Sequence, residues 1–236
     1  NNYVYIANMI STNYYLTVVD VTRPTSPTIC GSIQLNGQAF QVLIQGRYAY
    51  VGISNNNVIQ VVDVANAATP TIIQTLTVGS GNFNMCIQGR YLYVVNINAT
   101  TIQIIDTYIS SALIVVKTIT LSSNPRGIAI QGNYLYVGFQ SSSAFQIWDV
   151  SEPANYVSQV GSTTLSGSAV SIFVRGRYAY VSEFFDGQLE IVDVNDVTNP
   201  VVVSSALITG LTSFTGFDIL GRYWYTSTST AIKIYD

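Results

Sequence analysis

Histidine is absent from the sequence, and charged side chains make up only 9% of its 236 residues. Without histidine, the chain has neither a Ser–His–Asp nor a Cys–His catalytic arrangement. It also lacks metal-ligand spacing and a glycine-rich loop that would hold a phosphate. The sequence therefore predicts a protein that is not an enzyme and that binds no cofactor or metal ion.

Basic residues are few and scattered, which argues against a nucleic-acid partner, so none is predicted. The formal net charge is -3, the only lysines are Lys117 and Lys233, and the arginines recur at intervals along the chain. A surface that binds nucleic acid needs a basic stripe to displace counterions. Asn, Ser, Thr and Tyr fill the polar positions instead, and this composition favours an extracellular or cell-surface location.

Cysteines, long apolar runs and helical periodicity are also scarce. Cys30 and Cys86 are expected to be separate buried thiols on different sheets, so no disulfide is predicted. No apolar run approaches the ~20 residues of a membrane-spanning helix. Apolar residues do not recur at i, i+3 and i+4 over a useful length, so helix is expected to be essentially absent.

What the sequence does contain is a repeat. A segment of the type Gly-Arg-Tyr-x-Tyr-Val is followed each time by an apolar segment that ends on an aspartate, and a degenerate copy opens the chain. The aspartates recur every 43 or 44 residues, at Asp20, Asp63, Asp106, Asp149, Asp193 and Asp236. Each copy contains four short apolar runs separated by turn residues. In the second copy they are residues 39–44, 48–53, 58–64 and 71–78.

Four antiparallel strands in about 43 residues are typical of one blade of a β-propeller. We therefore expect an all-β propeller of four-stranded antiparallel blades, as a single domain over residues 1–236 built from six tandem repeats. The chain starts at the second strand of the first copy and stops at the third strand of the last, so the terminal blades are incomplete. Six blades are favoured. In a five-bladed alternative, residues 29–35 complete a blade made by the C-terminal strands.

Residues 189–200, Leu-Glu-Ile-Val-Asp-Val-Asn-Asp-Val-Thr-Asn-Pro, show the repeat most clearly. This pattern resembles the LVIVD-repeat family of propellers, and the resemblance covers the whole chain. It implies the propeller fold and, because such repeats occur mostly in surface or secreted proteins, a similar setting. The third copy lacks the proline that follows the aspartate elsewhere, so the connection after Asp106 is expected to differ.

The repeated arginines and aspartates are predicted to form structural ion pairs. In an antiparallel blade, the turn that carries the arginine lies at the same end as the aspartate, on neighbouring strands. The predicted pairs are Arg47–Asp63, Arg90–Asp106, Arg177–Asp193 and Arg222–Asp236. The equivalent aspartates lie about 10 Å out from the inner strand, so they cannot converge on one metal ion.

The opposite end carries the loops that usually form a binding face in propellers. The candidate ligand residues there are Tyr14, Tyr15, Arg126, Phe184, Phe185 and Asp218. Asn98 matches the acceptor pattern for N-glycosylation. The acidic residues of this region, Glu183, Asp186, Glu190 and Asp218, spread over two blades, so a glycosidase carboxylate pair is not predicted.

These observations predict a non-enzymatic, extracellular or cell-surface structural propeller. Its incomplete terminal blades leave open strand edges, which are templates for pairing with another chain. Self-association into an oligomer or filament, or contact with other surface proteins, is therefore expected. The first alternative is a module that binds a glycan or peptide at the aromatic loops, and the second is a propeller hydrolase or lyase.

Overall fold

The structure of the chain is a computed structural model, and it describes residues 2–81, 84–183, 187–207, 217–221, 223–227 and 232–235. The chain forms two compact units, residues 1–118 and 119–236. Within the described ranges both units are built from strands, and the single helical element is the one-turn 3-10 helix η1 (Ile97–Ala99). No helix in these ranges has the length and hydropathy of a membrane span. The chain is therefore all-β.

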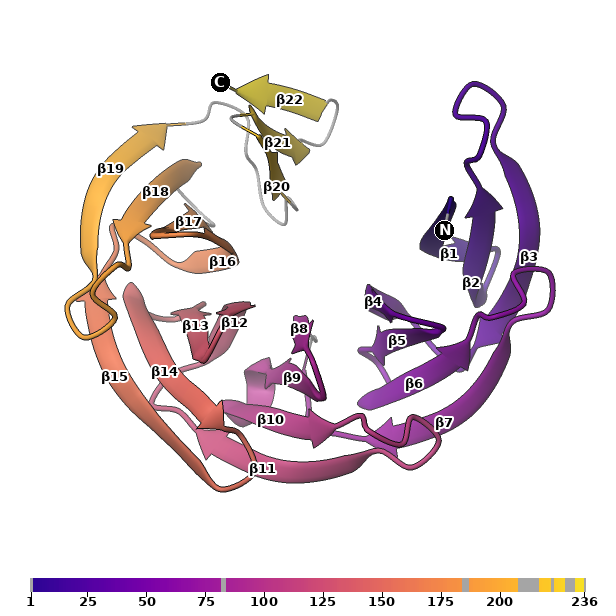
Figure 1. The fold of residues 1–236 in the computed structure, drawn as a ribbon, viewed down its shortest axis with the longest axis horizontal. Helices are drawn as coiled ribbons and strands as arrows, with labels where there is room; N and C mark the ends of the chain where they lie inside the picture. Colours follow the sequence, from indigo (N-terminus) through magenta and orange to yellow (C-terminus); the bar gives the residue numbers. More distant parts are fainter. Residues whose placement is uncertain are drawn as a thin grey trace. The chain divides into compact units, whose positions relative to one another are not determined.

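The first unit contains three sheets (Figure 1). The first sheet has three strands, β1 (Tyr3–Ile10), β2 (Asn13–Asp20) and β3 (Thr28–Leu35). The second has four, β4 (Ala39–Gln45), β5 (Tyr48–Ile53), β6 (Val58–Asp63) and β7 (Thr71–Thr77). The third has β8 (Met85–Gln88), β9 (Tyr91–Asn96), β10 (Thr101–Asp106) and β11 (Ile114–Thr120), and the unit boundary falls within β11.

The second unit also contains three sheets. The first has four strands, β12 (Pro125–Gln131), β13 (Tyr134–Phe139), β14 (Ala144–Glu152) and β15 (Tyr156–Thr164). The next has β16 (Ala169–Arg175), β17 (Tyr178–Glu183), β18 (Gln188–Asp193) and β19 (Val201–Leu207). The last has three strands, β20 (Phe217–Leu220), β21 (Tyr223–Ser227) and β22 (Ile232–Tyr235). Consecutive strands are neighbours in all of these sheets.

The alternation of each repeat explains how sheets pack within a unit. Side chains alternate between the two faces of a strand. In β5, Ala49 joins the buried cluster shared with the β1–β3 sheet, whereas Tyr50 joins the cluster shared with the β8–β11 sheet, beside Leu92. In the second unit Tyr136 and Ala179 meet in the same way. The β5 strand thus places a ring toward one neighbouring sheet and a small residue toward the other.

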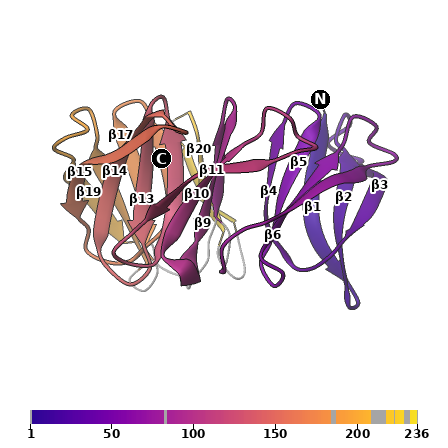
Figure 2. The ribbon, with the colours of Figure 1, turned by 90° about the horizontal axis from the view of Figure 1, so that it is seen from below.

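Strand pairing also bears on the alternative for the N-terminal segment. β3 pairs with β2, from Tyr14 opposite Leu35 to Asp20 opposite Thr28. Residues 29–35 therefore belong to the same sheet as the N-terminal hairpin. In the five-bladed alternative they would instead complete a blade made by the C-terminal strands. Seen from the side, the strands of each unit run between two ends at which the turns gather (Figure 2). That the whole chain forms one domain stays a prediction.

Candidate functional site

Ion pairs lie at one end of the sheets, where turns equivalent to the one between β4 and β5 occur. The structure brings together three of the predicted pairs, Arg47–Asp63, Arg90–Asp106 and Arg177–Asp193. Nε donates to Oδ1 over 3.2 Å from Arg47 and over 2.7 Å from Arg90. Arg222 and Asp236 lie outside the described residues.

The same aspartates shape the connection that follows them. The carboxylates of Asp63, Asp106 and Asp193 each accept the backbone N–H two residues further on, at 3.0, 2.9 and 3.0 Å. This closes an Asx-type turn. Hydrogen bonding from the arginine is the main cause that holds the pKa of each carboxyl below its usual value. These contacts fasten a turn to a strand end, which supports a structural role.

Acid is expected to weaken the fold through these aspartates. A carboxyl whose pKa is lowered by folding stabilises the protein above its unfolded pKa, and this contribution is lost as pH falls through the folded pKa. The melting temperature should therefore fall below about pH 4, and less steeply in the triple variant Arg47→Gln/Arg90→Gln/Arg177→Gln. Thermal unfolding followed by circular dichroism across this pH range tests the expectation, and equal slopes in the two proteins would contradict it.

The residues predicted for a ligand face are distributed over both units. Tyr14 and Tyr15 lie in β2 and are half-buried, and Tyr14 packs against a core cluster. Arg126 in β12 is 3% exposed, and burial lowers its pKa. Asn98 is exposed within η1. Phe184 and Phe185 lie outside the described residues, as does the side chain of Asp218, whose backbone lies opposite Tyr225.

The two cysteines are separate thiols, as expected. Cys30 lies in β3 and Cys86 in β8, and both are half-buried without a disulfide. Burial raises the pKa of the Cys86 thiol. Because the thiolate is the nucleophilic form, Cys86 is not a candidate for catalysis.

A pair of buried carboxyl groups lies at the other end of the β16–β19 sheet. Glu183 ends β17, and Glu190 in β18 lies opposite Val181. Residues two apart on a strand share a face, so Glu183 and Glu190 are diagonal neighbours on one face of the sheet. They are only 4% and 5% exposed. We call Glu183 and Glu190 the carboxyl pair.

The segment before β16 supplies hydrogen-bond donors to the carboxyl pair. The backbone N–H of Gly167 donates to Glu183 Oε1 over 2.7 Å, and the Ser166 hydroxyl lies 2.8 Å from Glu183 Oε2. The Ser166 N–H donates to Glu190 Oε2 over 3.1 Å, and Gln188 Oε1 also lies 3.1 Å from the hydroxyl. Ser166 is exposed. Its hydroxyl therefore links the buried carboxyl of Glu183 to the surface.

Burial is the main cause that raises the pKa of Glu183. The hydrogen bonds from Ser166 and Gly167 oppose this, while the neighbouring Glu190 raises the pKa further by repulsion and by hydrogen bonding. Two carboxyl groups this close ionise less readily together than apart. The pKa of Glu183 is thus raised above the ordinary glutamate value, which favours the protonated form.

Other repeats share the backbone hydrogen bond to position 190 but not the pair of carboxyl groups. Gln60, Gln103 and Glu190 each accept a backbone N–H from the residue 24 positions earlier, at 3.1, 2.8 and 3.1 Å. Three repeats thus use an acceptor at this position, and an amide serves in two of them. At the position of Glu183 the third repeat has Asn96. Only the fifth repeat places carboxyl groups at both positions.

Glu183→Gln is expected to raise the stability of the protein at neutral pH. A group whose pKa is raised by folding contributes stability below its unfolded pKa and loses it as pH rises through the folded pKa. Glutamine has no such dependence. The melting temperature of the variant should therefore exceed that of the wild type by an amount that grows with pH from about 4 upward. A difference that shrinks as the pH rises would contradict the raised pKa.

Four stretches of the chain match the family model of the LVIVD repeat, residues 1–34, 36–78, 124–162 and 166–207. No curated protein matches the sequence. Among solved structures, a protein from Lactobacillus plantarum is similar with a TM-score of 0.87 and 13% identity, over 99% of this chain and 77% of that one.

Two further solved structures are similar and have names that state an activity. A candidate 6-phosphogluconolactonase from Bacteroides uniformis has a TM-score of 0.85 and 15% identity, over 99% of this chain and 77% of that one. A periplasmic gluconolactonase from Pseudomonas aeruginosa has a TM-score of 0.79 and 14% identity, over 96% of this chain and 74% of that one. At such identities the likeness establishes the fold, and with the repeat matches it supports a β-propeller.

These names correct the function predicted from the sequence. A non-enzymatic structural propeller is contradicted, because the similar structures whose names state an activity are lactonases. Self-association through open strand edges stays a prediction. The prediction relied on the lack of histidine, which excludes histidine-based catalysis but leaves catalysis by carboxyl groups open. The carboxyl pair was missed because four acidic residues were treated as one scattered set, although two of them share a sheet face.

Proposed function

The chain belongs to the LVIVD repeat family, and we propose that it is a hydrolase that opens lactones of sugar acids with Ser166 and Glu183. One observation carries the proposal: a buried carboxyl with a raised pKa lies 2.8 Å from an exposed hydroxyl. A nucleophile and a base in hydrogen-bond contact, with the base oriented by a third group, are typical of covalent catalysis. Here the Gly167 N–H is the orienting group.

The proposed reaction is acyl transfer through Ser166. As Ser166 Oγ attacks the lactone carbonyl carbon, its proton passes to the Glu183 carboxylate. The bond between that carbon and the ring oxygen breaks, and Glu183 returns the proton to the leaving oxygen, which becomes a hydroxyl on the opened chain. Glu183 then takes a proton from water as the water attacks the ester, and Ser166 Oγ recovers a proton as the acid departs.

The lactonase names of the similar structures support the substrate class. Between a phosphorylated and an uncharged lactone, the carboxyl pair favours the uncharged one. When they are ionised, the two carboxyl groups repel a phosphate. We therefore assign an uncharged aldonolactone as the substrate and 6-phosphogluconolactone as the poorer one.

A pH-stat assay with glucono-δ-lactone tests this function. Wild-type protein should accelerate hydrolysis above the spontaneous rate, and the rate should increase as pH rises through the pKa of Glu183, because the carboxylate is the base. Ser166→Ala and the double variant Ser166→Ala/Glu183→Gln should retain the same residual activity, since residues that act as a unit are not additive. A wild-type rate equal to that of buffer contradicts the proposal, and so does full activity in Ser166→Ala.

We also propose that the six sheets are six blades of one propeller. Six repeats, each of which supplies one antiparallel sheet, support this count, and so does the pairing of β3 with β2. Class averages from negative-stain electron microscopy should show a ring of six sheets. Two separate lobes would contradict it.

A further inference from the structure

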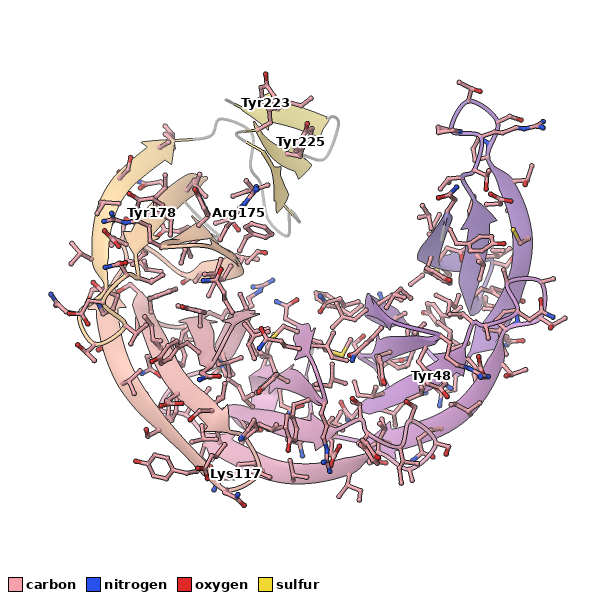
Figure 3. The ribbon with its side chains drawn as sticks, viewed as in Figure 1. Tyr48, Lys117, Arg175, Tyr178, Tyr223 and Tyr225 are labelled. Atoms are coloured by element: carbon pink, nitrogen blue, oxygen red, sulfur yellow. The ribbon has the colours of Figure 1, made fainter. Side chains whose placement is uncertain are left out.

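A groove of about 430 Å³ lies in the first unit, between the β4–β7 and β8–β11 sheets. Its volume falls within the range of about 300–1,000 Å³ that is usual for small-molecule sites. It lies at the end with the ion pairs, because Arg47 and Arg90 are among its lining residues. Tyr48, which begins β5 and is labelled in Figure 3, also lines it. We call it the tyrosine groove. Among the residues that line it are Gln45, Tyr48, Tyr50, Thr107, Tyr108 and Ser110.

The third repeat departs from the others at the groove. After the aspartate, the second and fifth repeats have valine, and the third has Thr107. Three residues further on, Ser110 stands where the fifth repeat has Val197, which packs against a core cluster. The fold is thus satisfied by apolar residues at both positions. Hydroxyl groups replace them where a cavity exists, which points to a ligand with hydrogen-bonding groups.

These hydroxyl groups form a short network on the groove wall. Thr107 Oγ1 donates to the Arg90 carbonyl over 2.8 Å. The Tyr50 hydroxyl lies 3.3 Å from Ser110 Oγ, which in turn lies 3.4 Å from the Thr107 carbonyl. The last two contacts are long for bonds between oxygen atoms. A ligand hydroxyl could therefore replace them at little cost.

A buried acceptor is unused on the other wall. Gln45 Nε2 donates to the Gly89 carbonyl over 2.6 Å, whereas Gln45 Oε1 is buried and has no partner in the described part of the chain. Gln131 occupies the same position in the fourth repeat, and its Oε1 accepts the Gly176 N–H over 2.9 Å. An acceptor without a partner costs free energy, and because Gln45 Oε1 is buried, a ligand would reach it only after the side chain turns toward the groove.

Aromatic faces and neutralised arginines complete the groove. Tyr108 is 77% exposed, and the Arg90 guanidinium lies 5.0 Å from its ring centroid. Arg47 lies 5.5 Å from the Tyr48 ring. Each arginine is already paired with an aspartate, so the groove offers N–H donors without net positive charge. This combination disfavours an anion and suits a neutral ring with hydroxyl groups on its edge and C–H groups on its face.

We infer that the tyrosine groove binds one uncharged sugar ring, stacked on Tyr108 and hydrogen-bonded to Ser110 and Thr107. This inference does not rest on the proposed hydrolase function. The groove residues all belong to the first unit, whereas the carboxyl pair belongs to the second. Free monosaccharides and the ends of glycan chains share this chemistry.

Isothermal titration calorimetry with methyl glycosides of glucose, galactose, mannose and N-acetylglucosamine tests the inference. At least one should bind with 1:1 stoichiometry, and Tyr108→Ala should weaken it by at least about tenfold. Thr107→Val/Ser110→Val, which introduces the residues of the fifth repeat, should abolish binding and leave the melting temperature unchanged. Asn195→Ala, at the position equivalent to Tyr108, is the matched control and should bind as the wild type does.

Titration of the matching oligosaccharides shows whether the natural ligand is a free monosaccharide or the end of a glycan chain. Tighter binding of an oligosaccharide identifies a glycan chain as the ligand, and equal affinities identify a free sugar. The inference is overturned if no glycoside binds, if the groove variants bind as the wild type does, or if inorganic phosphate binds more tightly than every sugar.

Discussion

Glu183→Gln is expected to lower the rate of lactone hydrolysis by about 10²- to 10⁴-fold, the usual contribution of a positioned acid–base group. Glutamine keeps the size of the side chain, its Oε1 can still accept the Gly167 N–H, and its Nε2 can donate to Ser166 Oγ. It cannot accept the proton of Ser166. The loss should appear in kcat, because the carboxylate acts on the reacting proton rather than on substrate binding.

Glu190→Gln is the matched control for this variant. The variant introduces glutamine, which is the natural residue at the equivalent positions of two other repeats. There the side chains of Gln60 and Gln103 accept the equivalent backbone N–H. Its activity should stay much closer to that of the wild type, with a pH profile shifted to lower pH, because removal of the neighbouring carboxyl lowers the pKa of Glu183. Equal losses in both variants would assign the effect to disturbed packing.

Gly161→Ala is expected to destabilise the second unit by about 3 kcal/mol, at the upper end of the usual cost of overpacking. A Cβ at this position of β15 would lie 2.0 Å from the carbonyl oxygen of Val197 and 3.0 Å from its carbonyl carbon. These are backbone atoms of the connection between β18 and β19, so they cannot move away as a flexible side chain would. The adjacent sheets would have to separate.

Gly176→Ala provides the comparison in the same unit. Gly176 has a φ of +61° and no atom within 4 Å of its would-be Cβ, so the alanine meets backbone strain without a clash. That strain costs about 1–2 kcal/mol. Urea denaturation should give a clearly lower midpoint for Gly161→Ala than for Gly176→Ala. Equal midpoints would mean that the two sheets are not in close contact at Val197.

Local features of the repeat were sufficient to predict the sheets. In the second copy the expected run at residues 48–53 is β5, and the run at 39–44 differs from β4 by one residue. Alternation of side chains and turn residues act over a few positions, so they can be read from the sequence. The pairing of Arg47 with Asp63 followed from strand register in the same way.

The carboxyl pair and the tyrosine groove depend on contacts that the repeat does not encode. Glu183 is buried by the segment around Ser166, which belongs to the connection between sheets, and its raised pKa follows from that burial. The groove forms where Tyr50 of one sheet meets Ser110 of the next. Departures from the repeat at Glu183, Glu190, Thr107 and Ser110 were the available signals.

The protonation of Glu183 is the property on which the proposed chemistry depends. Titration of its side-chain carboxyl carbon by ¹³C NMR, assigned by loss of the signal in Glu183→Gln, measures it directly. A pKa above that of an ordinary glutamate, and lowered in Glu190→Gln, is the predicted result. A pKa at or below the ordinary glutamate value would contradict the account, because the carboxyl would then be a structural acceptor and a weaker base.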